Sequence, residues 1–277
     1  MTTMTAPGRS AHALALQRIF AITIRHWHVV VRSPHRIFDI AVWPVVDAVL
    51  YSSIAMYMRQ ASSSTASNRI ALSVVAGIIM WHVVYQSQIA VSTSFFEESY
   101  SRQVPSLFAT PLRPIEWVLG AALQGMVKVV TGVTAVAVAG LLLYHFNIVN
   151  SGLGIVPMMA LLLLTGWAMA IIVLGLVLYL GSGSEALTWG LLFIVLPLSG
   201  ALYPVSALPA VVRPVSVILP TTRVFEAARA VATDTPGAWG QIGIAAIATA
   251  GLMAAALGFA GLAMGAYRRR GFISRAL

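Results

Sequence analysis

The sequence predicts an all-α integral membrane protein with six transmembrane helices, an interfacial helix before them and a re-entrant segment between the fifth and sixth. Of its 277 residues, 59% are hydrophobic and only 9% are charged, whereas soluble domains carry about 25% charged residues. The mean hydropathy is +0.87. Several apolar runs also approach the roughly 20 residues that a helix needs to cross a bilayer. These observations exclude a soluble domain, a disordered chain and a disulfide scaffold.

Six apolar runs account for the predicted spans. In chain order they cover residues 37–58, 70–96, 116–146, 155–180, 186–202 and 241–267. The third run is long enough to tilt, and the fifth is short and ends among prolines. The chain thus divides into a cytoplasmic segment (1–36), a six-span domain (37–267) and a basic cytoplasmic tail (268–277).

The segment before the first span is predicted to form a helix that lies on the membrane surface. Arg18, Arg25 and Arg32 recur every seven residues and therefore share one helical face. Aliphatic and aromatic residues occupy the other faces, a pattern that is typical of interfacial helices. The alternative is a soluble helix. We favour the interfacial helix because no soluble domain exists for it to pack on.

The arginines set the expected orientation. If both ends of the chain are cytoplasmic, eleven arginines lie inside and five outside, which agrees with the positive-inside rule. The net charge of +9 is then explained by topology and contact with anionic lipids, and nucleic-acid binding is not implied. The first apolar run begins only at residue 37, so we expect a signal anchor and no cleaved signal peptide.

A belt of polar side chains crosses the first three spans. By residue count, Asp47 and Lys128 lie roughly 15 and 18 Å into their spans, and the belt also contains His82, Gln86 and Gln124. Charges inside a membrane are costly and are candidate functional groups. The belt either lines a translocation path or proton relay, or it holds the bundle together through an Asp47–Lys128 ion pair. We favour the ion pair because an acid and a base at equal depth neutralise each other.

The sequence contains no catalytic or metal-binding motif. A nucleotide-binding P-loop needs a lysine that follows a glycine, but the sole lysine, Lys128, follows Val127. No His-Glu-x-x-His or Gly-x-Ser-x-Gly motif occurs, and the chain has no cysteine. We therefore expect a protein that is not an enzyme and that binds no metal or cofactor of its own.

The loop between the second and third spans has the features of a docking element. Two glutamates stand at the membrane edge, and a short helical stretch with an apolar tip follows. Prolines then stiffen the return into the third span. An apolar tip of this kind suits a groove on a partner protein, although a simple connecting turn is the alternative. The candidate residues are Glu97, Glu98, Ser101, Arg102, Leu107, Phe108, Pro111 and Arg113.

The segment 197–229 is apolar although it contains five prolines. Irregular apolar backbone is tolerated at membrane depth only where it is buried in protein. The sequence therefore predicts short re-entrant helices in the outer leaflet, in which Glu226 pairs with Arg223 or Arg229 three residues away. The candidate residues are Pro204, Pro209, Pro220, Arg223, Glu226 and Arg229.

Taken together, these features resemble the membrane subunit of bacterial ATP-binding-cassette exporters. The closer class is the type-2 export permeases, which include daunorubicin-resistance and polysaccharide-export permeases. The resemblance covers about residues 15–270 and rests on the order of the spans, the loop EESY…LFATPLRPIEW and the segment PTTRVFEAAR. Its most specific parts are Glu97 with Thr110-Pro111-Leu112, and Pro220 with Glu226 to Arg229.

The resemblance implies a half-transporter in the bacterial inner membrane. Two permeases, either two copies of this chain or this chain and a paralogue, pair with two cytoplasmic ATPase subunits that carry ATP and Mg. Residues 99–113 would be the coupling helix seated on the ATPase, with Glu97 at its base and Arg25 or Arg32 as its partner. The re-entrant segment would form an outer gate, and spans one, two and five would line the path.

The substrate and the energy source leave alternatives open. Short outer loops and a thin polar belt suit an amphiphile such as a drug, a lipid or a lipid-linked molecule. A polysaccharide or glycolipid exporter would need an aromatic lining, for which Trp43, Tyr51, Trp81 and Tyr85 are candidates, although packing is their expected role. An ion-coupled secondary transporter is the other alternative, with the polar belt as its relay. Such transporters often contain internal repeats, and the two halves of this sequence share none that is convincing.

Overall fold

The protein is a helical bundle in which four helices are long and apolar enough to cross a membrane. The computed structural model describes residues 11–61, 65–100, 110–145, 154–180, 186–232 and 236–269, and these ranges contain helices and no strand. The four long apolar stretches are Ser73–Glu98, Ile115–Tyr144, Ile155–Leu180 and Ala238–Tyr267. Their length and composition indicate a membrane-embedded protein.

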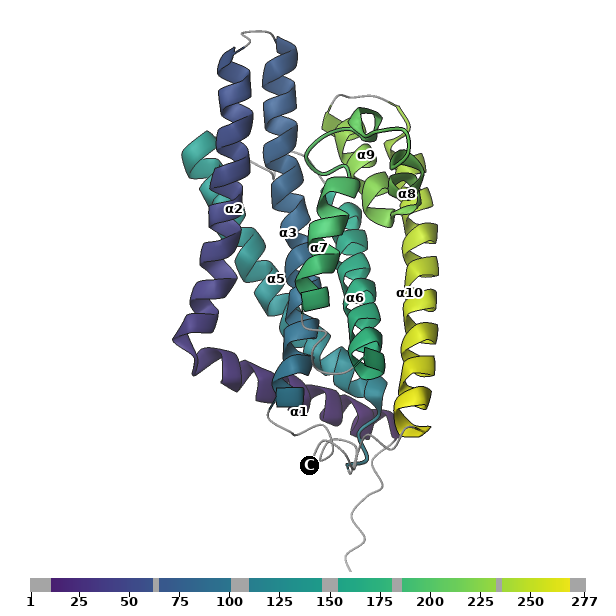
Figure 1. The fold of residues 1–277 in the computed structure, drawn as a ribbon. Coiled ribbons are helices and arrows are strands. Elements are labelled where there is room, and N and C mark those ends of the chain that lie inside the picture. Colours follow the sequence, from purple (N-terminus) through teal and green to yellow (C-terminus); the bar gives the residue numbers. More distant parts are fainter. Residues whose placement is uncertain are drawn as a thin grey trace, which may run out of the picture.

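The long helices run alternately up and down (Figure 1). Helix α2 (Pro34–Ala61) and helix α3 (Thr65–Tyr100) form a hairpin that extends beyond the rest of the bundle at one end. Helix α5 (Pro114–Tyr144) crosses them at a tilt, and α6 (Ile155–Leu180) lies beside α10 (Ala238–Arg269). The central helix is α3, because 78% of its apolar stretch is buried, against 17% for α10.

The predicted spans match helices closely, except where the fifth ends. The run 186–202 becomes α7 (Ala186–Leu198), which stops after Pro197. A proline removes a backbone donor and clashes with the preceding turn, so an early end is expected. The first and fifth runs correspond to the shorter apolar helical stretches Val42–Tyr57 and Ala186–Leu198. Three short elements follow α7: the 3-10 turn η3 (Val205–Ala207), α8 (Arg213–Ile218) and α9 (Pro220–Ala232).

Glycines allow the closest helix contacts. A Cβ atom on Gly166 of α6 would lie 1.8 Å from Ser87 Oγ and 2.7 Å from the Val84 carbonyl oxygen of α3. A Cβ atom on Gly77 of α3 would lie 2.0 Å from the carbonyl oxygen of Ala201. Small residues at helix interfaces permit this approach in membrane proteins, and here they join α3 to α6 and to the segment after α7.

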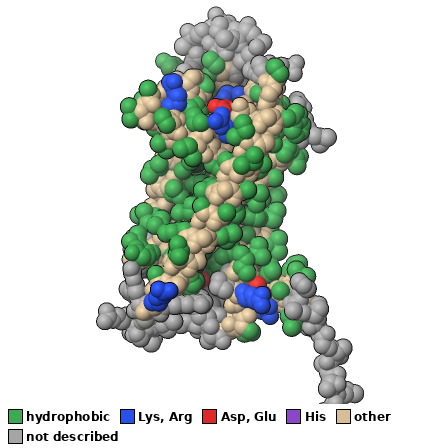
Figure 2. Space-filling view, turned by 90° about the vertical axis from the view of Figure 1, so that its right-hand side faces the viewer, with side chains coloured by type: hydrophobic (Ala, Val, Ile, Leu, Met, Phe, Trp, Pro, Cys, Tyr) green, Lys and Arg blue, Asp and Glu red, His purple; other side chains and the backbone are tan. Residues whose placement is uncertain are grey.

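Helix α1 (Ala11–Val31) lies across one end of the bundle, beside the end of α10 (Figure 1). Ile22, His26 and Val30 are buried against the bundle, while Leu16, Phe20 and Ile24 are exposed on the other side. Figure 2 shows hydrophobic side chains over the middle of one face and charged side chains at its two ends. This distribution is the one that a bilayer requires, since charges avoid the hydrocarbon.

Candidate functional site

Two ion pairs fasten α1 to the bundle. We call the set Arg18, Arg25, His26, Glu98 and Glu116 the α1 clamp. Arg25 pairs with Glu98 near the end of α3, and Arg18 pairs with Glu116 near the start of α5. The clamp therefore holds the two helices that precede and follow the chain segment 101–113.

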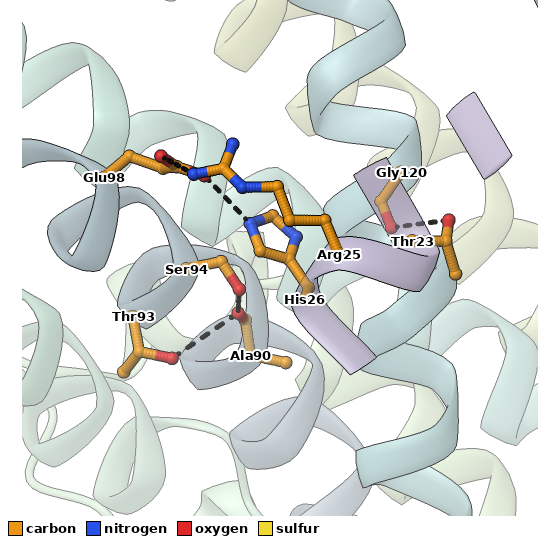
Figure 3. A network of polar contacts seen from close by, with 8 residues as sticks. All are labelled: Thr23, Arg25, His26, Ala90, Thr93, Ser94, Glu98 and Gly120. Carbon is orange, nitrogen blue, oxygen red and sulfur yellow. Dashed lines mark hydrogen bonds and ion pairs between the residues drawn. The ribbon is translucent and has the colours of Figure 1, made fainter. Parts of the chain in front are cut away.

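The Glu98 carboxylate is buried between two groups of α1. Arg25 Nη2 donates to Glu98 Oε2 at 2.7 Å, and His26 Nε2 lies 3.3 Å from Oε1 (Figure 3). The Glu98 side chain is 4% exposed, whereas that of Arg25 is 38% exposed. The ring of Trp117 meets His26 edge to face, with centroids 5.9 Å apart. A buried carboxylate needs such charged and polar partners because it has left water.

The second half of the clamp is a forked pair. Arg18 Nε and Nη2 donate to Glu116 Oε2 and Oε1 at 2.8 and 2.7 Å. Glu116 Oε2 also accepts the backbone N–H of Arg113 at 3.0 Å, which fixes the first turn of α5. The Glu116 hydrogen bond raises the pKa of Arg18. Between the two pairs, Thr23 Oγ1 donates to the Gly120 carbonyl oxygen at 3.1 Å (Figure 3).

The structure corrects the assignment of the carboxylate that receives α1. The resemblance pointed to Glu97, with Arg25 or Arg32 as its partner, but Arg25 bonds Glu98. One helical step of about 100° separates the two glutamates, and it turns Glu98 toward α1 while Glu97 is half-buried. Arg32 is exposed at the end of α1. Glu116 was not among the predicted site residues, although an acidic residue two positions after Pro114 is a recognisable signal for the first turn of a helix.

Part of the predicted coupling loop lies outside the described residues. Ser101, Arg102, Leu107 and Phe108 belong to this part, so their roles stay predictions. Pro111 and Arg113 are exposed just before α5. The exposure of these two residues agrees with a loop at the protein surface.

The polar belt is present, but Asp47 has a different neighbour from the expected one. His82 Nε2 of α3 lies 3.7 Å from Asp47 Oδ2 of α2, and His82 is fully buried. Within the described ranges, the neighbour of Asp47 is His82, which forms an ion pair with it only when the ring is protonated, and the expected pair with Lys128 is wrong. Residue counting placed Lys128 at the same depth, but α5 is tilted (Figure 1). Val136, eight residues further along α5, packs in one cluster with Ala48.

The remaining belt residues are buried between helices. Gln86 Nε2 donates to the carbonyl oxygen of Ile40 at 3.2 Å and so joins α3 to α2. Lys128 is 9% exposed. The Gln124 amide has neither of its polar atoms hydrogen-bonded to the described chain. These positions make the belt an internal feature of α2, α3 and α5.

Polar contacts hold the segment after α7 in place. Thr222 Oγ1 donates to the Ser216 carbonyl oxygen at 2.6 Å, and Ser216 Oγ donates to that of Leu198. Arg229 Nη1 donates to the carbonyl oxygen of Gly200, which has a φ of 73°. A positive φ favours glycine at this turn. Burial lowers the pKa of Arg229.

The predicted pairing of Glu226 is confirmed for one of its two candidates. Arg223 Nη1 donates to Glu226 Oε2 at 3.0 Å across one turn of α9. Pro220 is buried at the start of α9, where a missing N–H is tolerated. Pro204 and Pro209 are exposed around η3. The predicted short helices therefore exist in this segment.

The described residues contain no group of three or more His, Asp or Glu side chains that is placed to hold a metal ion. In comparisons with known proteins, no family model matches the chain, and no curated protein matches it significantly.

Proposed function

We propose that the chain is the membrane-spanning permease subunit of a bacterial ATP-binding-cassette exporter. In this proposal α2, α3, α5, α6, α7 and α10 cross the inner membrane, and both chain ends are cytoplasmic. The chain works with a second permease, a copy or a paralogue, and with a separate ATPase dimer that binds ATP and Mg. Its substrate is an amphiphile such as a drug, a lipid or a lipid-linked molecule.

The observation that carries the proposal is the position of the α1 clamp. Its two glutamates, Glu98 and Glu116, bracket the segment 101–113, and both are bonded to α1. A displacement of that segment would be transmitted to α3, α5 and α1 together, because charge-assisted hydrogen bonds at 2.7 Å are strong and directional. Such a linkage is what a loop needs if it passes the motion of an ATPase to membrane helices.

The course of the chain supports six passes. The start of α2 and the end of α10 lie at the same end of the bundle as α1 (Figure 1). That arrangement requires an even number of passes, in agreement with the excess of arginines on the cytoplasmic side. Helix α7 is short, with 13 residues. The elements η3, α8 and α9 after it then complete the outer part of the bundle as a re-entrant gate.

Co-purification with the ATPase tests the proposal. Replacing Phe108 with Asp places a charge on the apolar tip of the predicted coupling loop, so binding of a co-expressed ATPase should be lost while the spans still insert. The matched control is Phe146→Asp, since Phe146 follows the opposite end of α5. Retention of the ATPase by Phe108→Asp at unchanged membrane yield would contradict the coupling-loop assignment.

The contact between Asp47 and His82 favours one second candidate, an ion-coupled secondary transporter. A carboxylate 3.7 Å from a buried imidazole can exchange a proton with it, as a proton relay requires. The two candidates differ in their energy source. Transport that stops with a protonophore while ATP remains available would support the relay, and transport that persists would support the ATPase-driven exporter.

A further inference from the structure

An exposed carboxylate interrupts the apolar face of α2. The Asp47 side chain is 41% exposed, although it lies within the apolar stretch Val42–Tyr57. Nearby residues of the same helix, including Val46, Leu50 and Ile54, are exposed hydrophobic side chains. A carboxylate exposed to hydrocarbon is costly, and a cationic group that approached this face of α2 would lower that cost.

The neighbour of Asp47 favours a cationic group that donates hydrogen bonds. His82 is fully buried, and its Nδ1 lies 2.8 Å from the Ile78 carbonyl oxygen. Because a carbonyl oxygen only accepts, Nδ1 donates this bond, and Nε2 of the neutral ring is an acceptor. That Nε2 has no hydrogen-bond partner in the described chain and faces Asp47 Oδ2 at 3.7 Å. An ammonium group that lies beside two acceptors at this separation can donate to both of them.

Aromatic residues of α2, α3 and α7 are candidates for the walls of a site around this pair. Trp43 and Tyr51 lie four residues before and after Asp47, on the same face of α2. The Tyr85 ring of α3 lies 5.7 Å from His82 and 6.2 Å from Trp189 of α7. Trp43 and Trp189 are 55% and 41% exposed, so both rings are accessible. Aromatic faces attract cations, and they also bind apolar groups.

With a neutral His82 ring, the charge of Asp47 is not balanced from within the described chain. In the described part of the chain, neither an arginine nor the lysine forms an ion pair with Asp47. A carboxylate, an acceptor imidazole and ring faces all favour positive charge. An anion would meet repulsion at each of them.

We propose that Asp47, His82, Trp43, Tyr51, Tyr85 and Trp189 form a binding site for a lipophilic protonated amine. The ammonium group donates to Asp47 Oδ2 and His82 Nε2, and the apolar body of the ligand lies against the rings. The ligand reaches the site within the membrane, from the exposed face of α2. This proposal rests on the proposed function, because it names the substrate class of the same permease.

Two probes of opposite charge test the site directly. Monodansylcadaverine ends in an ammonium group, and dansyl-ε-aminocaproic acid carries the same fluorophore with a terminal carboxylate. The purified full chain in neutral phosphatidylcholine nanodiscs is titrated with each, and dansyl emission is measured. We expect saturable binding of the amine at least about tenfold tighter than that of the acid. Equal affinities in the unmodified protein would overturn the proposal, whatever the variants do.

Substitutions identify the residues involved. Asp47→Asn should weaken amine binding about tenfold or more, while Asp47→Glu keeps the charge and should retain most of it. The matched control is Asp39→Asn, the same change two turns away on α2, which should leave binding unchanged. Trp189→Leu should weaken binding severalfold, and Trp189→Phe should restore part of it. Unchanged affinity in both Asp47→Asn and Trp189→Leu would contradict the site.

The binding assay uses neither nucleotide nor ATPase, so its failure is separate from that of the proposed function. If the amine fails to bind while the ATPase still co-purifies, the permease role stands and the substrate class is wrong. If the amine binds through Asp47 but no ATPase associates, the site stands on a protein of another transport class.

Discussion

At the residue scale, the choice between two adjacent glutamates decides how α1 is attached. Glu98 is almost fully buried, and it holds Arg25 and His26 together. Arg25 retains partial access to water or lipid headgroups. The two partners of this pair are therefore unequal, and removing each should have a different effect on stability.

We expect Arg25→Met to destabilise the protein by about 2 kcal/mol or more, because it removes the guanidinium that compensates a buried carboxylate. Glu98→Gln should cost less, since the amide oxygen still accepts from Arg25 and that guanidinium can reach solvent. The measurement is thermal unfolding in mild detergent.

Arg32→Met is the matched control, because Arg32 is exposed at the end of the same helix. Its effect should stay within about 0.5 kcal/mol. A smaller loss for Arg25→Met than for Glu98→Gln would show that burial of the carboxylate does not govern the clamp.

At the element scale, the contact between α3 and α6 depends on the absence of a side chain at Gly166. We expect Gly166→Ala to destabilise the protein by about 2 kcal/mol, because the new Cβ atom would overlap Ser87 Oγ and the backbone oxygen of Val84. Adding Ser87→Ala should recover only part of the loss, since the Val84 carbonyl oxygen remains. Thermal unfolding of the single and double variants measures both effects.

Gly251→Ala on α10 is the control, because a Cβ atom there meets nothing within 4 Å. It should be neutral or stabilising by up to about 1 kcal/mol, the difference in helix propensity between the two residues. Equal destabilisation by Gly251→Ala and Gly166→Ala would contradict the packing argument.

The helices were predictable from the sequence, but their lateral contacts were not. Long apolar runs give a strong signal, and the closely spaced prolines correctly predicted short helices after α7. The partner of Asp47 was missed because residue counting assumes upright helices, and α5 is tilted. The partners Arg18 and Glu116 are 98 residues apart in the chain. No local pattern encodes such a contact, so only the packed bundle reveals it.

At the scale of the whole molecule, the absence of cysteine makes the topology directly testable. Single cysteines can be introduced at exposed positions without removing native ones: Leu16 on α1, Gln60 at the end of α2 and Ser206 in η3. In intact cells, we expect a membrane-impermeant maleimide to label positions 60 and 206. Position 16 should react only after permeabilisation.

This pattern follows from six passes with both ends inside, because α1 and η3 lie at opposite ends of the bundle (Figure 1). Labelling of the same three variants in permeabilised cells is the control for reactivity, and all three positions should react there. Labelling of position 16 from outside would reverse the proposed orientation.

The clamp on α1 also has a consequence for the order of events during synthesis. Helix α1 leaves the ribosome before its anchors, because Glu98 and Glu116 follow Arg25 and Arg18 by 73 and 98 residues. Helix α1 is therefore made well before it can be fixed to the bundle. Until α3 has entered the membrane, neither anchor is in place, and the second is added only with α5. A nascent chain arrested before Glu116 would present α1 to proteases and chaperones that never meet it in the finished protein.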